Sequence, residues 1–169
     1  MTDNNASSGD LGLSGQPAAT GSGEHRDYVT MSIADQMFGI PVLKVQDVLG
    51  TQSITRVPLA PPEVAGSLNL RGRIVTAIDV RPRLGMPKRD EGKNPMSVVV
   101  EHDGELYSLL VDSVGEVLSL DTRDYQRNPP TLNPRLREFS DGIYRLNGSL
   151  LVVLSVASLL NLGGRADAA

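Results

Sequence analysis

An internal repeat limits the architecture available to this chain. Residues 28–49 align without a gap with residues 97–118, and residues 66–84 align in the same way with residues 142–160. Apolar positions and turn glycines coincide in both blocks. Strand–turn–strand sequences resemble one another in general, but two ungapped blocks in the same order favour a true duplication. The repeat therefore predicts two similar small modules, each ending in a short helix.

Within each module the apolar pattern is that of short β-strands. Val29, Met31 and Ile33 alternate with polar residues, which is typical of a half-buried strand. Asp-Gly, Asn-Gly and Pro separate similar runs at nearly regular spacing, as in barrels and sandwiches. Strands are expected at 29–33, 38–42, 45–49, 54–57, 74–78, 97–100, 106–111, 114–118, 143–146 and 150–154, and helices or helical turns at 62–68, 82–84 and 156–160.

The two ends of the chain differ in composition from the rest. Residues 1–26 are mostly Gly, Ser, Asn, Ala and Thr, which bury too little apolar surface to offset the entropy of ordering. We expect a disordered tail there, a second tail at 163–169, and a structured part at 27–162. No basic segment followed by an apolar stretch opens the chain, and no apolar run reaches the roughly 18 residues that span a bilayer. Neither a signal peptide nor a membrane span is expected.

The chain carries little equipment for catalysis or metal binding. It has no Cys and only two His, which excludes thiolate zinc sites, iron–sulfur clusters and Cys nucleophiles. The acids are scattered over loops, as solvated side chains are, rather than paired as acid–base catalysis requires. Neither a Gly-x-Ser-x-Gly elbow nor a Gly-rich phosphate loop before a helix occurs. The sequence therefore predicts a protein that is not an enzyme and has no metal and no cofactor.

Positive charge gathers in one stretch of a chain whose net charge is −4. Between residues 71 and 89 the only acid is Asp79, and the cations are Arg71, Arg73, Arg81, Arg83, Lys88 and Arg89. Such a patch can meet nucleic-acid phosphates, but the aromatic residues on which small barrels stack bases are not interleaved with it. Three interpretations stay open: a solvated face, a nucleic-acid interface, and an Arg-rich site for acidic groups of a protein partner.

Longer motifs carry a family resemblance. They are Phe38-Gly-Ile-Pro-Val-x-x-Val-Gln-Asp-Val, Val57-Pro-Leu-Ala-Pro and Val64-Ala-Gly-Ser-Leu-Asn-Leu-Arg-Gly-Arg. In order and spacing they resemble the chemotaxis coupling proteins of the CheW family, and the likeness extends over about residues 27–162. It implies a mainly β fold of two SH3-like five-stranded β-barrel subdomains with a few short helices. We expect one subdomain to contain 27–90 with 156–162, and the other to contain 91–155.

The resemblance also implies a function without catalysis. Proteins of this family are adaptors that bind the cytoplasmic tip of transmembrane chemoreceptors and the regulatory domain of the histidine kinase CheA. Such a protein is cytoplasmic, is recruited to membrane-associated chemoreceptor arrays, and neither inserts into the membrane nor binds nucleic acid. No phosphotransfer, ATP-binding or receiver domain is recognisable, so a free-standing CheW-like protein is the closest match. Two alternatives stay open: a small-barrel nucleic-acid-binding module, and a coupler for an array that controls a process other than motility.

Carried over residue by residue, the resemblance indicates a receptor- or kinase-binding site. Its candidate residues are Val45, Asp47, Gly66, Asn69, Leu70 and Arg71. Val45 is explained equally well as a core residue, because the repeat places it on Val114. Gly66 falls on Gly142 and serves a turn or close packing equally well.

Arg71 is the candidate with the strongest functional interpretation. Its counterpart in the repeat is Asn147, so the fold itself does not require a cation there. We therefore expect the Arg71 side chain to be exposed or half-exposed and to contact a partner. The sequence departs from the family at Ser155, where members often carry an acid before the last helix. A serine can still cap that helix by accepting a backbone hydrogen bond.

Overall fold

The computed structural model describes residues 24–90 and 92–161. The predicted tails lie mostly outside the described residues. Residues 25 and 26, which their composition assigned to the first tail, belong instead to a strand. Within the described ranges, no helix is long and apolar enough to cross a bilayer.

Both repeats fold into five strands followed by a short α-helix, but their 3-10 turns lie at different places and the second repeat has one further helix, α3. The first repeat contains β1 (His25–Ile33), β2 (Gln36–Pro41), η3 (Val42–Lys44), β3 (Val45–Leu49), β4 (Val64–Leu70), β5 (Arg73–Asp79) and α2 (Val80–Arg83). The second contains β6 (Met96–His102), β7 (Glu105–Val111), β8 (Ser113–Asp121), η4 (Thr122–Asp124), α3 (Pro134–Glu138), β9 (Ser140–Leu146), β10 (Ser149–Leu154) and α4 (Val156–Leu160).

Strand pairing confirms the duplication at the level of single residues. β2 and β10 pair in parallel with Phe38 opposite Val152. The equivalent strands of the other copy, β7 and β5, pair in parallel with Tyr107 opposite Thr76, which are the repeat equivalents of Phe38 and Val152. The two halves therefore share their register as well as their order of elements.

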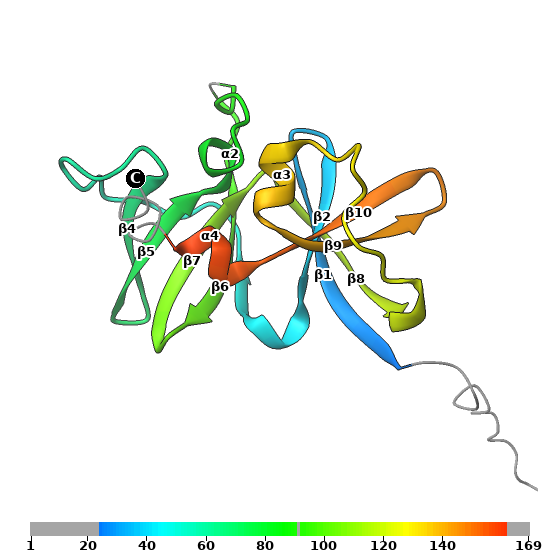
Figure 1. The fold of residues 1–169 in the computed structure, drawn as a ribbon. Coiled ribbons are helices and arrows are strands. Elements are labelled where there is room, and N and C mark those ends of the chain that lie inside the picture. Colours follow the sequence, from blue (N-terminus) through cyan, green and yellow to red (C-terminus); the bar gives the residue numbers. More distant parts are fainter. Residues whose placement is uncertain (1–23, 91, 162–169) are drawn as a thin grey trace, which may run out of the picture.

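The strands form two five-stranded sheets that interleave the repeats. Their orders are β8-β1-β2-β10-β9 and β3-β6-β7-β5-β4, and the two sheets lie side by side (Figure 1). This pairing corrects the expected division into 27–90 with 156–162, and 91–155, since β1 and β2 belong with β8, β9 and β10. The reason is that the β2–β10 and β5–β7 pairs are parallel, and parallel neighbours cannot be joined by a hairpin.

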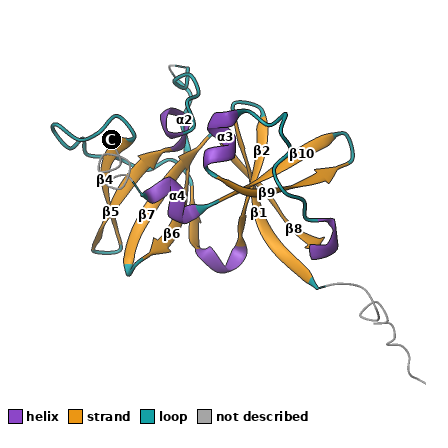
Figure 2. Cartoon of the chain, viewed as in Figure 1, coloured by secondary structure: helices purple, strands orange, loops and turns teal. Residues whose placement is uncertain are grey.

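Single bridges close each sheet into a barrel. In the first sheet Gln126, which follows β8, pairs with Ile143 of β9; in the second, Thr55, which follows β3, pairs with Ser67 of β4. We call the sheet β8-β1-β2-β10-β9 barrel 1 and the sheet β3-β6-β7-β5-β4 barrel 2. The mainly β fold of two five-stranded barrels with a few short helices is confirmed (Figure 2).

The main core lies between the barrels and is shared by both sheets and the three short α-helices. It includes Phe38 and Ile143 of barrel 1 and Val98 and Leu109 of barrel 2, all fully buried. Each barrel also has its own small interior cluster. These clusters consist of Tyr28, Tyr144, Leu151 and Val153 in barrel 1, and of Leu68, Val75, Ala77 and Leu110 in barrel 2.

The short helices differ in how well the sequence predicted them. α4 spans the expected residues, and Ser155 caps it by accepting a hydrogen bond from the backbone N–H of Ser158, as expected. The helix expected at 62–68 is wrong: those residues form most of β4, because pairing with β5 overrides their weak helical spacing. α3 was not expected, although Asn133 caps it and Pro134 begins it, which are both helix-start signals.

Candidate functional site

Asp47, Leu70 and Arg71 meet on one side of barrel 2. Asp47 lies on β3, Leu70 ends β4, and Arg71 begins the two-residue turn before β5. They line a cavity of about 230 Å³ together with Gln46, Arg73, Val99, Glu101 and Leu106. β3 and β4 are the outer strands of the sheet, so closure of the barrel brings together residues that are distant in sequence.

An ion pair crosses the seam between these outer strands. Arg71 Nη2 donates to Asp47 Oδ2 at 2.9 Å. The Arg71 side chain remains 74% exposed, which confirms its expected exposure, and that of Asp47 remains 27% exposed. Ion pairs this exposed contribute only about 0–1 kcal/mol to stability. Both groups therefore remain available to a partner at little cost to the fold.

The turn that carries Arg71 is held in an unusual conformation. Arg71 and Gly72 both have positive φ, 52° and 86°, as in the tight primed turns of hairpins. Asn69 stabilises this turn, because its Oδ1 accepts a hydrogen bond from the Gly72 backbone N–H at 2.9 Å. Asn69 thus positions the arginine from the preceding strand.

Val45 and Gly66 have clear structural reasons for their positions. Val45 is half-buried and packs against the main core. Gly66 is buried where Thr55 bridges to β4, and a Cβ on it would clash with the Thr55 carbonyl oxygen. Gly142, its repeat equivalent, has the same role, since a Cβ there would clash with the Tyr125 ring. Close packing at the barrel closure explains both glycines.

The cationic stretch does not form a single surface. Arg81 donates two hydrogen bonds to the Asp112 carboxylate, and Arg89 bonds both Asp112 and Asp79. The Arg81 hydrogen bonds hold the pKa of Asp112 at about 2, below its usual range, with smaller contributions from the Ala34 backbone N–H and Arg89. Arg81 and Arg89 therefore stabilise the fold through these hydrogen bonds and are not available to a ligand.

Arg83 is also part of the interior. Its side chain is 1% exposed, and its guanidinium donates to the backbone carbonyls of Leu159, Ser158 and Asn161 in the last turn of α4. The guanidinium also lies 4.7 Å from the centre of the Phe139 ring. Of the six cations in the stretch, this leaves Arg71, Arg73 and Lys88 with largely exposed positions.

Ile74 is an exposed apolar residue on the hairpin that carries Asn69, Leu70 and Arg71, although it does not line the cavity and the sequence did not single it out. It is 71% exposed and lies directly opposite Asn69 across the β4–β5 hairpin. Residues 74–78 form a run of mostly apolar residues, so their pattern gave no sign of which face would be open. The β4–β5 hairpin therefore carries both Arg71 of the ion pair and an exposed aliphatic side chain. Its groups are suited to binding a protein surface.

The described residues offer no cluster of three His, Asp or Glu side chains that could hold a metal ion. Two carboxylates, an amide, two guanidinium groups and aliphatic side chains make up the site around Arg71. None of these side chains is an activated nucleophile or a desolvated acid–base pair. These groups can form ion pairs, hydrogen bonds and apolar contacts with another molecule.

Comparison with known proteins gives a consistent result. The family model described as "CheW-like domain" matches residues 27–163. The chemotaxis protein CheW of Rhizobium meliloti (strain 1021) is 28% identical over 134 residues, which cover 79% of this chain and 86% of that protein. The chemotaxis protein CheW of Klebsiella aerogenes is 26% identical and covers 80% and 82%. The crystal structure of the scaffolding protein TtCheW from Thermoanaerobacter tengcongensis superposes with a TM-score of 0.74 at 30% identity, covering 82% of this chain and 94% of that one.

Proposed function

The chain belongs to the CheW-like domain family and is a chemotaxis adaptor, and on that premise we propose that it couples chemoreceptors to the histidine kinase CheA. In this proposal the chain binds the cytoplasmic tip of the receptors and the regulatory domain of the kinase at the same time. It is recruited from the cytoplasm to the membrane-associated array. Coupling then requires one rigid body with two contact surfaces and no chemical step.

The observation that carries the proposal is the exposed surface around Arg71 and Asp47. The pair is held on closed strands and a braced turn, so its geometry is fixed before a partner arrives. Ile74 exposes an apolar side chain on the same β4–β5 hairpin, opposite Asn69. Arginine next to exposed aliphatic groups is typical of the residues that dominate protein interfaces. We assign receptor or kinase contact to Asp47, Asn69, Leu70 and Arg71, with Val45 and Gly66 supporting them.

Replacing Arg71 tests this assignment. We expect Arg71→Ala to weaken co-sedimentation with receptor-containing membranes or with CheA by about tenfold, because it removes a charged anchor at an interface. The free energy of unfolding should change by less than about 0.5 kcal/mol, because the side chain is exposed. Lys88→Ala is the matched control, since Lys88 is also an exposed cation but does not line the cavity. Unchanged binding by Arg71→Ala to both partners would contradict the assignment.

No observation favours the alternative functions. A nucleic-acid interface would need the cationic stretch as a surface, whereas Arg81, Arg83 and Arg89 are bound within the fold. A coupler for an array with another output would have the same contacts. An array with another output would therefore differ from a motility array in its receptors and kinase and not in the contacts of this chain.

A further inference from the structure

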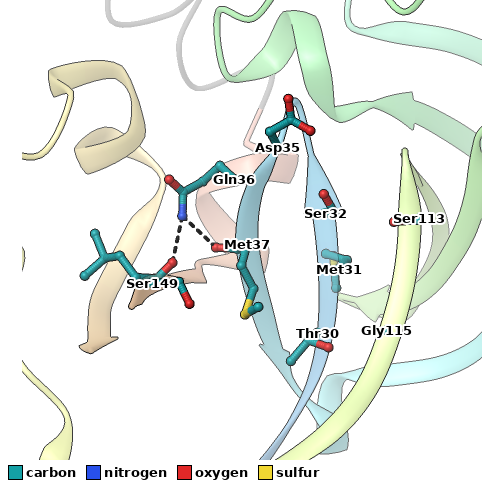
Figure 3. Close-up of a pocket in the computed structure, with 10 residues that line it drawn as sticks. Thr30, Met31, Ser32, Asp35, Gln36, Met37, Ser113, Gly115 and Ser149 are labelled. Atoms are coloured by element: carbon teal, nitrogen blue, oxygen red, sulfur yellow. Dashed lines mark hydrogen bonds between the residues drawn. The ribbon is translucent and has the colours of Figure 1, made fainter. Parts of the chain in front are cut away.

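Barrel 1 contains a larger cavity at the position equivalent to the candidate site of barrel 2. Its volume is about 430 Å³, and it lies on β10, β2, β1 and β8 (Figure 3). Thr30, Ser32, Met37, Gly115 and Ser149 line it, and their repeat equivalents Val99, Glu101, Leu106, Gln46 and Arg73 all line the cavity of barrel 2. The two cavities are therefore the same feature of the two barrels.

The two cavities differ in what fills them. In barrel 2, Arg71 and Arg73 are among the lining residues, and Arg71 donates to Asp47. In barrel 1 the equivalent positions hold the short residues Asn147 and Ser149. Glu116, the repeat equivalent of Asp47, follows the lining residue Gly115 in the chain but does not itself line the cavity. The larger volume of the barrel 1 cavity is consistent with the loss of both arginine side chains.

The lining of the barrel 1 cavity is rich in hydrogen-bond acceptors. Asp35, in the turn between β1 and β2, is the acid among its lining residues, and among the described residues that line it none is a cation. The Gln36 amide nitrogen donates hydrogen bonds to the backbone carbonyls of Met37 and Leu150 (Figure 3). The other polar atom of this side chain, its amide oxygen, can accept a hydrogen bond from a ligand. The hydroxyls of Ser32, Ser113 and Ser149 can also accept. A donor-rich cation is the complement of such a lining.

We propose that this cavity of barrel 1 binds an arginine side chain presented by a protein partner. The partner's guanidinium would take the place that Arg71 and Arg73 occupy in barrel 2. A planar group with five N–H donors matches carboxylate and carbonyl acceptors better than a compact ammonium does. The proposal goes beyond the coupling function, because it concerns the other barrel and depends only on the duplication and the lining residues.

The test titrates the full chain with Nα-acetyl-arginine-N-methylamide and follows its amide resonances by NMR. We expect shifts confined to Ser32, Gly115, Ser149 and the Gln36 side-chain amide, saturating in the millimolar range, on the order expected for one side chain. The citrulline analogue has nearly the shape of arginine without its charge. The lysine analogue has the charge without the planar arrangement of N–H donors. Both should bind at least about fivefold more weakly. Equal binding of either analogue, or shifts spread over acidic residues outside the cavity, would overturn the proposal.

Two substitutions provide an independent check. Asp35→Asn, in the lining, and Glu116→Gln, next to the lining residue Gly115, should each weaken binding of the arginine probe by about threefold, as expected for loss of an exposed charge pair. Asp103→Asn is the matched control, because Asp103 also lies in a hairpin turn at positive φ but on barrel 2. Asp103→Asn should leave binding unchanged. A loss as large in the control as in both test variants would show general charge attraction and contradict the site.

Discussion

At the scale of single residues, position in the fold separates arginines that support the structure from one that is available for binding. Arg81 and Arg89 share Asp112, a residue more than 20 positions away along the sequence. Arg83 is enclosed by the end of α4. Arg71 has one exposed partner and high exposure. The sequence showed a cluster of cations. It did not show which of these cations pair with carboxylates or carbonyls in the folded protein.

The Asp112 carboxylate should make stability depend on pH. Its pKa is about 2 in the folded protein and near 3.8 without the fold, so its contribution is present above pH 4 and is lost as pH falls towards 2. The shift corresponds to about 2 kcal/mol. We expect Asp112→Asn to lower the free energy of unfolding at pH 6 by about 2 kcal/mol and to reduce the loss between pH 5 and pH 2, measured by urea unfolding.

Asp103→Asn is the control for this measurement, because the Asp103 side chain is 86% exposed. It should follow the pH profile of the unsubstituted protein. A profile for Asp112→Asn that also overlays that of the unsubstituted protein would mean that the Asp112 cluster contributes nothing to acid sensitivity.

Gly66 offers a second residue-scale prediction. Gly66→Ala should lower the free energy of unfolding by about 3 kcal/mol or more, because the added Cβ meets the Thr55 carbonyl at a strained positive φ of 149°. Gly50→Ala, where a Cβ meets nothing within 4 Å, should change it by less than about 0.5 kcal/mol. Thermal or urea unfolding measures both. A stable Gly66→Ala protein that fails to bind partners would instead indicate a direct contact at this position.

At the scale of elements, the sequence predicted most strands and the repeat, but not their assembly. The repeat shows that the β1–β2 hairpin resembles the β6–β7 hairpin. It does not show that β1 and β2 pair with strands of the second repeat, or that β6 and β7 pair with strands of the first. β4 was misassigned because residues 62–68 have apolar spacing compatible with a helix turn, and only its pairing with β5 decides the matter. The candidate site was partly predictable, since family motifs indicated Arg71 and Asp47, whereas the exposure of Ile74 within an apolar run has no signal in the sequence.

Interleaving predicts how the chain behaves when it is divided. A fragment of residues 24–90 contains β1 and β2 but lacks the strands β8 and β10 with which they pair. We expect this fragment and a fragment of residues 92–161 each to lack a cooperative unfolding transition as monomers, and their mixture to recover one. Circular dichroism and NMR of the separate and mixed fragments measure this. A monomeric fragment that folds alone would contradict mutual completion of the barrels.

At the scale of the whole molecule, the barrels form one rigid body with different surfaces on equivalent positions. The shared core between them fixes their relative placement. Barrel 2 presents an arginine across its seam, and barrel 1 presents an acceptor-lined cavity at the matching place. Duplication thus provides two similar frames, and a few substitutions give them different recognition chemistry. This arrangement suits an adaptor that holds partners in a fixed relation.

The most direct test of the coupling function is the kinase activity of a reconstituted array. Receptors in membranes, CheA and this chain are combined, and phosphorylation by CheA is measured with and without receptor ligand. We predict that receptor control of the kinase appears only when the chain is present, and that Arg71→Ala reduces it while Lys88→Ala does not. Kinase activity that is unchanged by addition of the folded chain would contradict the account.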